Sequence, residues 1–148
     1  MLLRLVAALI LGGLMGIERE RIGKEAGVGT AMLVAAGASI FSMISLAIPH
    51  IADGGQTWGT IPDRVAANIV VGIGFLGAGI IIQRGGHVRG LTTAALIWAV
   101  AAVGTLVGLG LIPFAAASAV IISGTLYLIR RIGIKERVRD WGGENESD

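Results

Sequence analysis

The feature that most constrains this chain is a succession of five long apolar runs. They cover residues 5–17, 28–48, 65–82, 91–107 and 111–129. A helix needs about 20 predominantly apolar residues to cross a bilayer. The second to fifth runs are long enough. The first run is shorter, so it can span the bilayer only if it tilts little or if the side chain of Arg4 reaches the interface. The pattern predicts an all-α polytopic membrane protein.

The composition supports the same class. Hydrophobic residues make up 54% of the chain and charged residues only 15%, whereas soluble domains average about 25% charged residues. The absence of cysteine excludes disulfides, thiolate metal sites and cysteine nucleophiles. The first apolar run is followed directly by charges and has no small-residue cleavage motif, so we expect no cleaved signal peptide.

The distribution of basic residues predicts the orientation, because cytoplasmic loops are enriched in Lys and Arg. Alternate connections and the tail hold ten of the twelve basic residues, namely Arg19, Arg21, Lys24, Arg84, Arg89, Arg130, Arg131, Lys135, Arg137 and Arg139. We therefore expect five spans with the N-terminus outside and the C-terminus in the cytoplasm. Glycines at 108 and 110 and Pro113 predict a tight hairpin between the last two spans. Residues 1–129 then form the membrane domain, and residues 130–148 a basic juxtamembrane segment and an acidic disordered tail.

Small residues recur at helical spacing in two of the runs. In membranes such faces allow helix backbones to approach closely. We expect helix packing at Ala8, Gly12 and Gly16, and at Gly72, Gly74, Gly77, Ala78 and Gly79. Either face could pack inside the bundle, form a homo-oligomer contact or line a ligand cavity. The GxGxxG spelled by the second group is no nucleotide site, because it lies inside an apolar run without the acidic residue that such sites need.

Polar residues at and within the runs are the candidate functional positions. Asn68 is an amide well inside the third run, so it should bond a neighbouring helix or line a polar cavity. Two charged groups border the runs. They are Glu18, Arg19 and Glu20 after the first run, and Asp63 and Arg64 before the third. These residues either form interfacial salt bridges, with Glu18 and Arg21 as an i,i+3 pair, or contact an ion or another ligand.

The segment RGGHVRGLTTAA connects the third and fourth runs. Its glycine pair predicts a tight turn, and Thr92 or Thr93 is expected to cap the following helix. Arg84 and Arg89 near that helix N-terminus could attract an anion such as a lipid phosphate. His87 has no second histidine nearby, so we expect no metal site there. No catalytic constellation is present, and the basic residues lack the interleaved aromatics of nucleic-acid binders.

Five segments together resemble the MgtC/SapB family. They are GIERE at 16–20, AGxxT at 26–30, GIGFLGAGIII at 72–82, VRGLTTAA at 88–95 and WAVAAVG at 98–104. The resemblance implies a multi-pass protein of the bacterial or archaeal cytoplasmic (inner) membrane that is linked to growth at low magnesium. Some members act on the membrane ATP synthase, and direct magnesium transport by the family is doubtful. Family members often have Arg and His where this chain has Gly29 and Ala31, and glutamine where it has Asn68. Virulence-type members also have a cytoplasmic domain that resembles the ACT fold, and we do not extend regulation through that domain to this chain.

We therefore expect a non-enzymatic membrane protein without a cofactor, in which any link to magnesium rests on the resemblance alone. It would sit in the lipid bilayer as a homo-oligomer, with a dimer favoured, and would bind another membrane component such as the ATP synthase. The alternative is a small oligomeric cation transporter or channel, in which Asn68 and the carboxylates of Glu18 or Asp63 gather around a path. The identity of the ligand and the face that forms the oligomer stay open.

Overall fold

The computed structural model describes residues 1–52, 61–84 and 87–132. The elements in chain order are α1 (Leu2–Arg21), α2 (Val28–Ala52), α3 (Ile61–Ile80), β1 (Ile82–Arg84), β2 (His87–Arg89), α4 (Leu91–Gly108) and α5 (Ile112–Arg131). The all-α prediction is confirmed for these residues, with one short antiparallel ribbon in addition, in which Gln83 pairs with Val88. The glycine turn at 85–86, the segment 53–60 and the tail from 133 lie outside the described residues.

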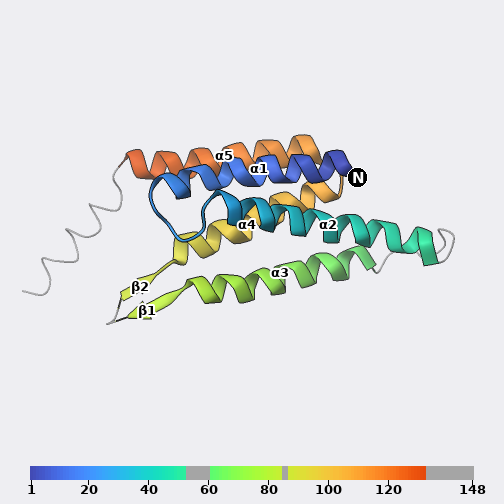
Figure 1. The fold of residues 1–148 in the computed structure, drawn as a ribbon, viewed down its shortest axis with the longest axis horizontal. Coiled ribbons are helices and arrows are strands. Elements are labelled where there is room, and N and C mark those ends of the chain that lie inside the picture. Colours follow the sequence, from blue (N-terminus) through green and yellow to red (C-terminus); the bar gives the residue numbers. More distant parts are fainter. Residues whose placement is uncertain (53–60, 85–86, 133–148) are drawn as a thin grey trace, which may run out of the picture.

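Consecutive helices run in opposite directions along one long axis (Figure 1). The ends of α1, α3 and α5 therefore share one end of the bundle with the starts of α2 and α4. The predicted hairpin between α4 and α5 is confirmed. Its turn depends on Gly110, whose φ of 91° lies in the left-handed region that favours glycine, and whose N–H donates to the Val107 carbonyl over 2.9 Å.

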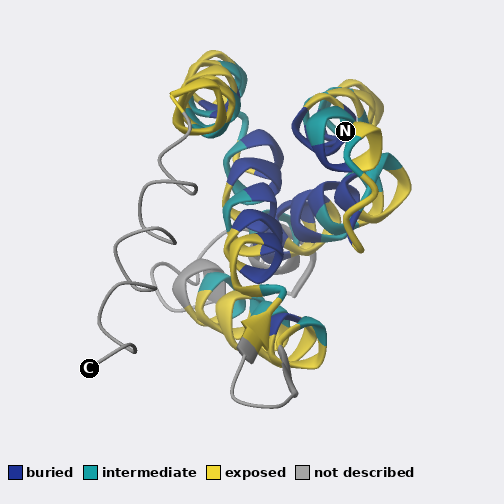
Figure 2. Cartoon of the chain, turned by 90° about the vertical axis from the view of Figure 1, so that its left-hand side faces the viewer, coloured by how far each residue is buried: buried dark blue, intermediate teal, exposed yellow. Residues whose placement is uncertain are grey.

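Helix α4 is the centre of the bundle and contacts each of the other four helices. Buried residues gather around it, while the outer helix faces are exposed (Figure 2). The apolar core consists of Ala8, Met15, Ala31, Ala35, Leu96, Val100, Val103, Val107, Ala115 and Ala119. These residues come from α1, α2, α4 and α5. Helix α3 contributes none of them, so it lies at the edge of the bundle.

Small residues set the distance between the inner helices. A Cβ added to Gly104 of α4 would lie 2.8 Å from the Cα of Ala35, and one added to Gly12 of α1 would lie 2.7 Å from the Cβ of Ala35. Gly108 lies equally close to α2, where a Cβ would come within 2.6 Å of the Ser42 Cβ. Both α1 and α4 thus approach one small-residue stripe on α2 too closely for a side chain, as expected where van der Waals packing drives helix association in lipid.

Helix α4 does not begin in the way that the sequence predicts. The N-cap residue is Gly90, with φ of 84°, and no side chain caps the helix. Thr92 and Thr93 lie inside its first turn, so the expectation that one of them caps α4 is wrong. A Cβ on Gly90 would collide with the carbonyl oxygen of Ile80. The close return of the chain past the end of α3 requires glycine here, and this requirement sets where α4 begins.

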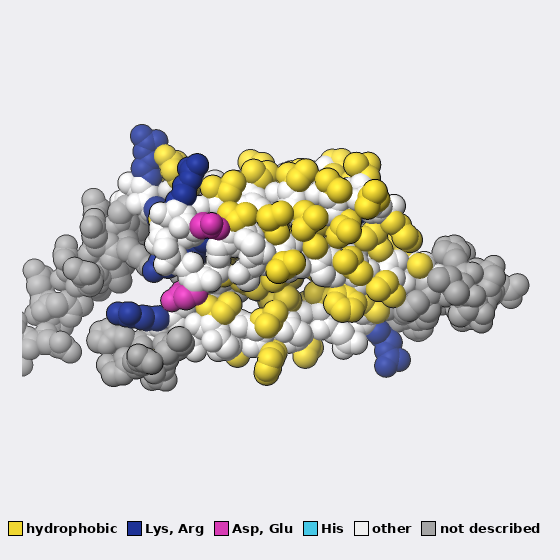
Figure 3. Space-filling view, viewed as in Figure 1, with side chains coloured by type: hydrophobic (Ala, Val, Ile, Leu, Met, Phe, Trp, Pro, Cys, Tyr) yellow, Lys and Arg dark blue, Asp and Glu magenta, His cyan; other side chains and the backbone are white. Residues whose placement is uncertain are grey.

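Within the described part of the chain, three helices are long and apolar enough to cross a membrane, over residues Val28–Ala47, Leu91–Gly108 and Ile112–Arg131. A shorter apolar helix covers Arg64–Ile80. On the face shown in Figure 3, hydrophobic side chains cover the middle of the molecule, and most of the Lys and Arg side chains drawn in colour lie at one end. We call this the basic end and define it by Arg19, Arg21, Lys24, Arg89, Arg130 and Arg131. The arrangement is that of a membrane protein.

Candidate functional site

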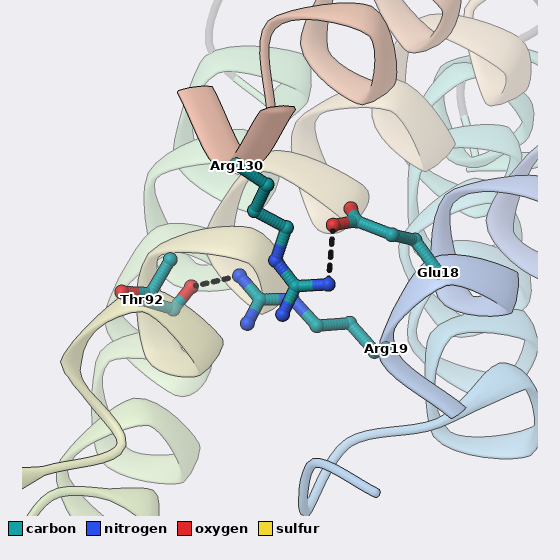
Figure 4. A network of polar contacts seen from close by, with 4 residues as sticks. All are labelled: Glu18, Arg19, Thr92 and Arg130. Atoms are coloured by element: carbon teal, nitrogen blue, oxygen red, sulfur yellow. Dashed lines mark hydrogen bonds and ion pairs between the residues drawn. The ribbon is translucent and has the colours of Figure 1, made fainter. Parts of the chain in front are cut away.

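Three successive charged residues lie near the end of α1, and each contacts a different helix. The Oε1 atom of Glu18 lies 3.1 Å from Nη1 of Arg130 on α5. Arg19 donates from Nη2 to the carbonyl oxygen of Thr92 on α4, over 3.2 Å. Figure 4 shows these two side chains reaching toward different neighbours. The Oε2 atom of Glu20 accepts a hydrogen bond of 2.7 Å from the N–H of Val28, the first residue of α2.

The GIERE segment is therefore the junction of four helices. The carboxylate of Glu20 lies at the N-terminus of α2, where the helix dipole favours a negative charge. The predicted pair of Glu18 with Arg21 is wrong, because the ion pair found among the described residues joins Glu18 to Arg130 instead. These two partners are far apart in sequence, and only the return of α5 beside α1 brings them together (Figure 1).

Arg19 is the buried charge of this junction and is only 4% exposed. Its Nε atom has no hydrogen-bond partner among the described residues. Burial of a charge is costly unless it is hydrogen-bonded, so the bond to the Thr92 carbonyl offsets part of this cost. Arg19 links the end of α1 to the first turn of α4, the position at which the sequence predicted a threonine cap.

The predicted packing residues divide into two groups. Ala8 is fully buried, and Gly12 and Gly16 lie against α2, where a Cβ on Gly16 would come within 2.7 Å of the Val28 Cα. In α3 the situation is different. A Cβ added to Gly72, Gly74 or Gly79 would have no neighbour within 4 Å, Ala78 is exposed, and only Gly77 lies near α4, with the Ala94 Cβ at 3.6 Å.

Asn68 is exposed and lines a groove between α2 and α3. This groove, which we call the α2–α3 groove, has a volume of about 680 Å³. Its walls are apolar apart from Asn68, and they are formed by Leu33, Val34, Gly37, Ala38, Phe41, Val65, Ile69, Gly72, Ile73 and Leu76. An amide on a membrane-exposed helix face needs a hydrogen-bonding partner. The groove thus combines one polar group with an apolar surface that another helix could approach closely.

The other predicted residues are not gathered into one site. Arg64 is exposed near the start of α3, at the end of the bundle opposite the GIERE segment. Arg89 and Thr92 are exposed at the basic end, and Thr93 is buried. The side chains of Asp63, Arg84 and His87 lie outside the described part of the structure. Among the described residues, no three His, Cys, Asp or Glu side chains come together as a metal site.

Two contacts were not anticipated from the sequence. Arg4 donates from Nη1 to the Gly108 carbonyl over 2.8 Å, and so joins the start of α1 to the end of α4. Gly104 and Gly108 form the close contact of α4 with α2. Their four-residue spacing is the same signal as that of Gly12 and Gly16, and could have identified them. Nothing in the sequence marks Gly108 as the acceptor for Arg4.

Comparison with known proteins decides the family. A sequence model of the MgtC family matches residues 5–134. This chain belongs to the MgtC family. It is 48% identical over 126 residues to Protein MgtC of Brucella abortus (strain 2308), which covers 85% of this chain and 50% of that protein. It is 44% identical over 129 residues to Protein MgtC of Salmonella typhimurium (strain LT2), which covers 87% of this chain and 52% of that protein.

The chain thus spans about half the length of the MgtC proteins it matches. No solved structure matches it. The resemblance seen in the five sequence segments is confirmed, and all five lie within the residues that the MgtC family covers. The GIERE junction, the α2–α3 groove and the Gly90 turn are therefore features of a membrane protein of this family.

Proposed function

We propose that this protein is a non-enzymatic component of magnesium and ion homeostasis that acts by binding another protein within the cytoplasmic membrane. The MgtC family name supports the link to magnesium. The observation that carries the binding proposal is the open face of α3. On this face a Cβ added to Gly72 or Gly79 would have no neighbour within 4 Å, although small residues on membrane helices serve close helix contact.

The same face offers a means of recognition. Asn68 lines the α2–α3 groove four residues before Gly72, so both lie on one side of α3. A partner helix laid into the groove would meet an apolar floor and one amide that can donate and accept hydrogen bonds. In lipid an interhelical hydrogen bond contributes about 0.6–2 kcal/mol. The partner that the family resemblance suggests is a membrane subunit of the ATP synthase.

Affinity purification of the tagged protein from its own membranes tests this proposal. We expect ATP synthase membrane subunits to co-purify, and we expect Gly72→Leu to reduce their recovery at least several-fold, because the side chain would fill the groove. Gly124→Leu is the matched control, since Gly124 of α5 also has no neighbour within 4 Å and lies outside the groove. The proposal fails if wild-type protein recovers no ATP synthase subunit, or if both variants recover as much as the wild type.

The second candidate is an oligomeric cation transporter. The exposure of Asn68 favours it, because several copies could place this amide around a common axis. Purified protein in liposomes would then raise magnesium, sodium or proton flux above that of empty vesicles, and Asn68→Leu would lower it. Fluxes equal to those of empty vesicles for all three ions would exclude this function, while leaving the binding proposal intact.

A further inference from the structure

A second groove lies between α1 and α5 at the basic end of the bundle. Its volume is about 690 Å³. Its lining comes from one face of each helix, since the residues repeat at the three- and four-residue spacing of a helix side. They are Leu14, Ile17, Glu18, Arg21, Ile22, Ser123, Tyr127, Arg130 and Arg131. We call it the α1–α5 groove. It shares none of its residues with the α2–α3 groove.

The groove carries an excess of positive charge. Three arginines line it against one carboxylate, and among the described residues the ion pair at 3.1 Å joins Glu18 to Arg130. Arg21 and Arg131 are both exposed, and this ion pair does not neutralise their charges. A guanidinium binds a phosphate with two parallel hydrogen bonds, and does so better than a lysine ammonium. The mouth of the groove is therefore complementary to a phosphate group.

Away from this mouth, toward the middle of α1, the lining of the groove is apolar. Leu14 is 55% exposed and Ile17 is half-buried, and they lie two turns and one turn of α1 before Arg21. Both belong to the first apolar run, so they lie on the hydrocarbon side of the charges. Tyr127 is 60% exposed on the opposite wall, and tyrosine is enriched where membrane proteins meet the headgroup layer. Its hydroxyl and that of Ser123 can donate to further oxygens.

An occupant that satisfies both parts needs an anionic head and a hydrocarbon chain in one molecule. We propose that the α1–α5 groove binds an anionic phospholipid, with its phosphate on Arg21 and Arg131 and an acyl chain along Leu14 and Ile17. Basic pockets between membrane helices are suited to anionic headgroups. A free phosphate would use only the mouth, and a second copy of this chain would bring its own excess of arginine to the same surface.

Lipid retention in native mass spectrometry tests the proposal. Purified protein in detergent is mixed with phosphatidylglycerol or with phosphatidylcholine of the same acyl chains. We expect retention of phosphatidylglycerol, and a loss of about tenfold or more when Arg21→Gln and Arg131→Gln are combined, because each basic residue near a membrane surface is worth about 1 kcal/mol. The matched control combines Lys24→Gln with Arg89→Gln, which removes two exposed charges from the same end outside the groove.

Equal retention of both lipids overturns the proposal, and so does an equal loss in the groove variant and its control, which would show general charge attraction. Leu14→Ser separates the lipid from a free anion. It should weaken phosphatidylglycerol binding several-fold, and inorganic phosphate at millimolar concentration should not displace the lipid. Displacement by phosphate would reduce the site to an anion site and contradict the proposal. If the double arginine variant does not fold, Arg131→Gln alone, at the last residue of α5, gives the same comparison against Lys24→Gln.

Discussion

At the scale of single residues, the glycines of this chain lie in very different surroundings. Gly104 lies so close to α2 that a Cβ would be 2.8 Å from the Ala35 Cα, whereas Gly124 on α5 has open space around it. A backbone atom cannot move aside as the end of a flexible side chain can. The same substitution should therefore have different effects on stability at these two positions.

We predict that Gly104→Ala lowers the free energy of unfolding by about 1–3 kcal/mol, the usual cost of overpacking a core. Gly124→Ala should be neutral, or should raise it by up to about 1 kcal/mol, because alanine loses less conformational entropy in a helix than glycine does. Unfolding of both variants in mixed micelles with increasing denaturing detergent measures the difference. Equal stability of the two variants would contradict the close contact between α4 and α2.

At the scale of helices, the sequence predicted the elements better than their contacts. The apolar runs place all five helices, and the hairpin between α4 and α5 follows from Gly110 and its neighbours. The first residue of α4 was predicted correctly, but its cap was predicted wrongly. Threonines near a helix start usually indicate a cap, but the ribbon brings the chain so close to Ile80 that glycine has to occupy the N-cap.

Long-range partners could not be predicted from local patterns. The spacing of Glu18 and Arg21 suits a pair on one helix, yet Glu18 contacts Arg130, which comes near only when α5 packs beside α1. Small-residue faces are similarly ambiguous. Those of α1 and α3 look alike in sequence, but Gly12 packs against α2, while Gly72 faces open space because α3 lies at the edge of the bundle.

The ion pair of Glu18 and Arg130 should tie α5 to the rest of the bundle. Ala115 and Ala119 are the only residues of α5 that are buried, so this helix has few other anchors. The side chains of the pair are 23% and 41% exposed, and partly exposed pairs contribute about 0.2–1 kcal/mol. A double-mutant cycle of Glu18→Gln and Arg130→Gln, measured by unfolding in mixed micelles, should give a coupling energy in this range.

The control cycle replaces Arg130→Gln with Arg131→Gln, which removes the same charge from the adjacent residue. We expect its coupling to Glu18 to be near zero. If both cycles give the same value, Glu18 responds to the general positive charge of the basic end rather than to one partner. The specific tie between α1 and α5 would then be wrong, although the excess charge of the α1–α5 groove would be unaffected.

At the scale of the whole molecule, α4 separates two surfaces with different chemistry. Figure 1 shows α5 above it and α3 below it. The α2–α3 groove is apolar with a single amide, and the α1–α5 groove opens at the basic end among arginines. A protein partner at the first and a lipid at the second would not compete for space. Both proposals therefore depend on how the protein is oriented in the membrane.

The orientation can be measured because the chain has no cysteine, so that a single introduced thiol is the only one labelled. Lys24 is exposed at the basic end, and Leu111 is 51% exposed in the turn between α4 and α5 at the opposite end. With five spans and the basic end in the cytoplasm, as the positive-inside rule predicts, a membrane-impermeant maleimide should label Leu111→Cys in intact spheroplasts. Lys24→Cys should react only after permeabilisation. The reverse pattern would place the basic end outside, and labelling of both positions from outside would show that the helices between them do not cross the membrane an odd number of times.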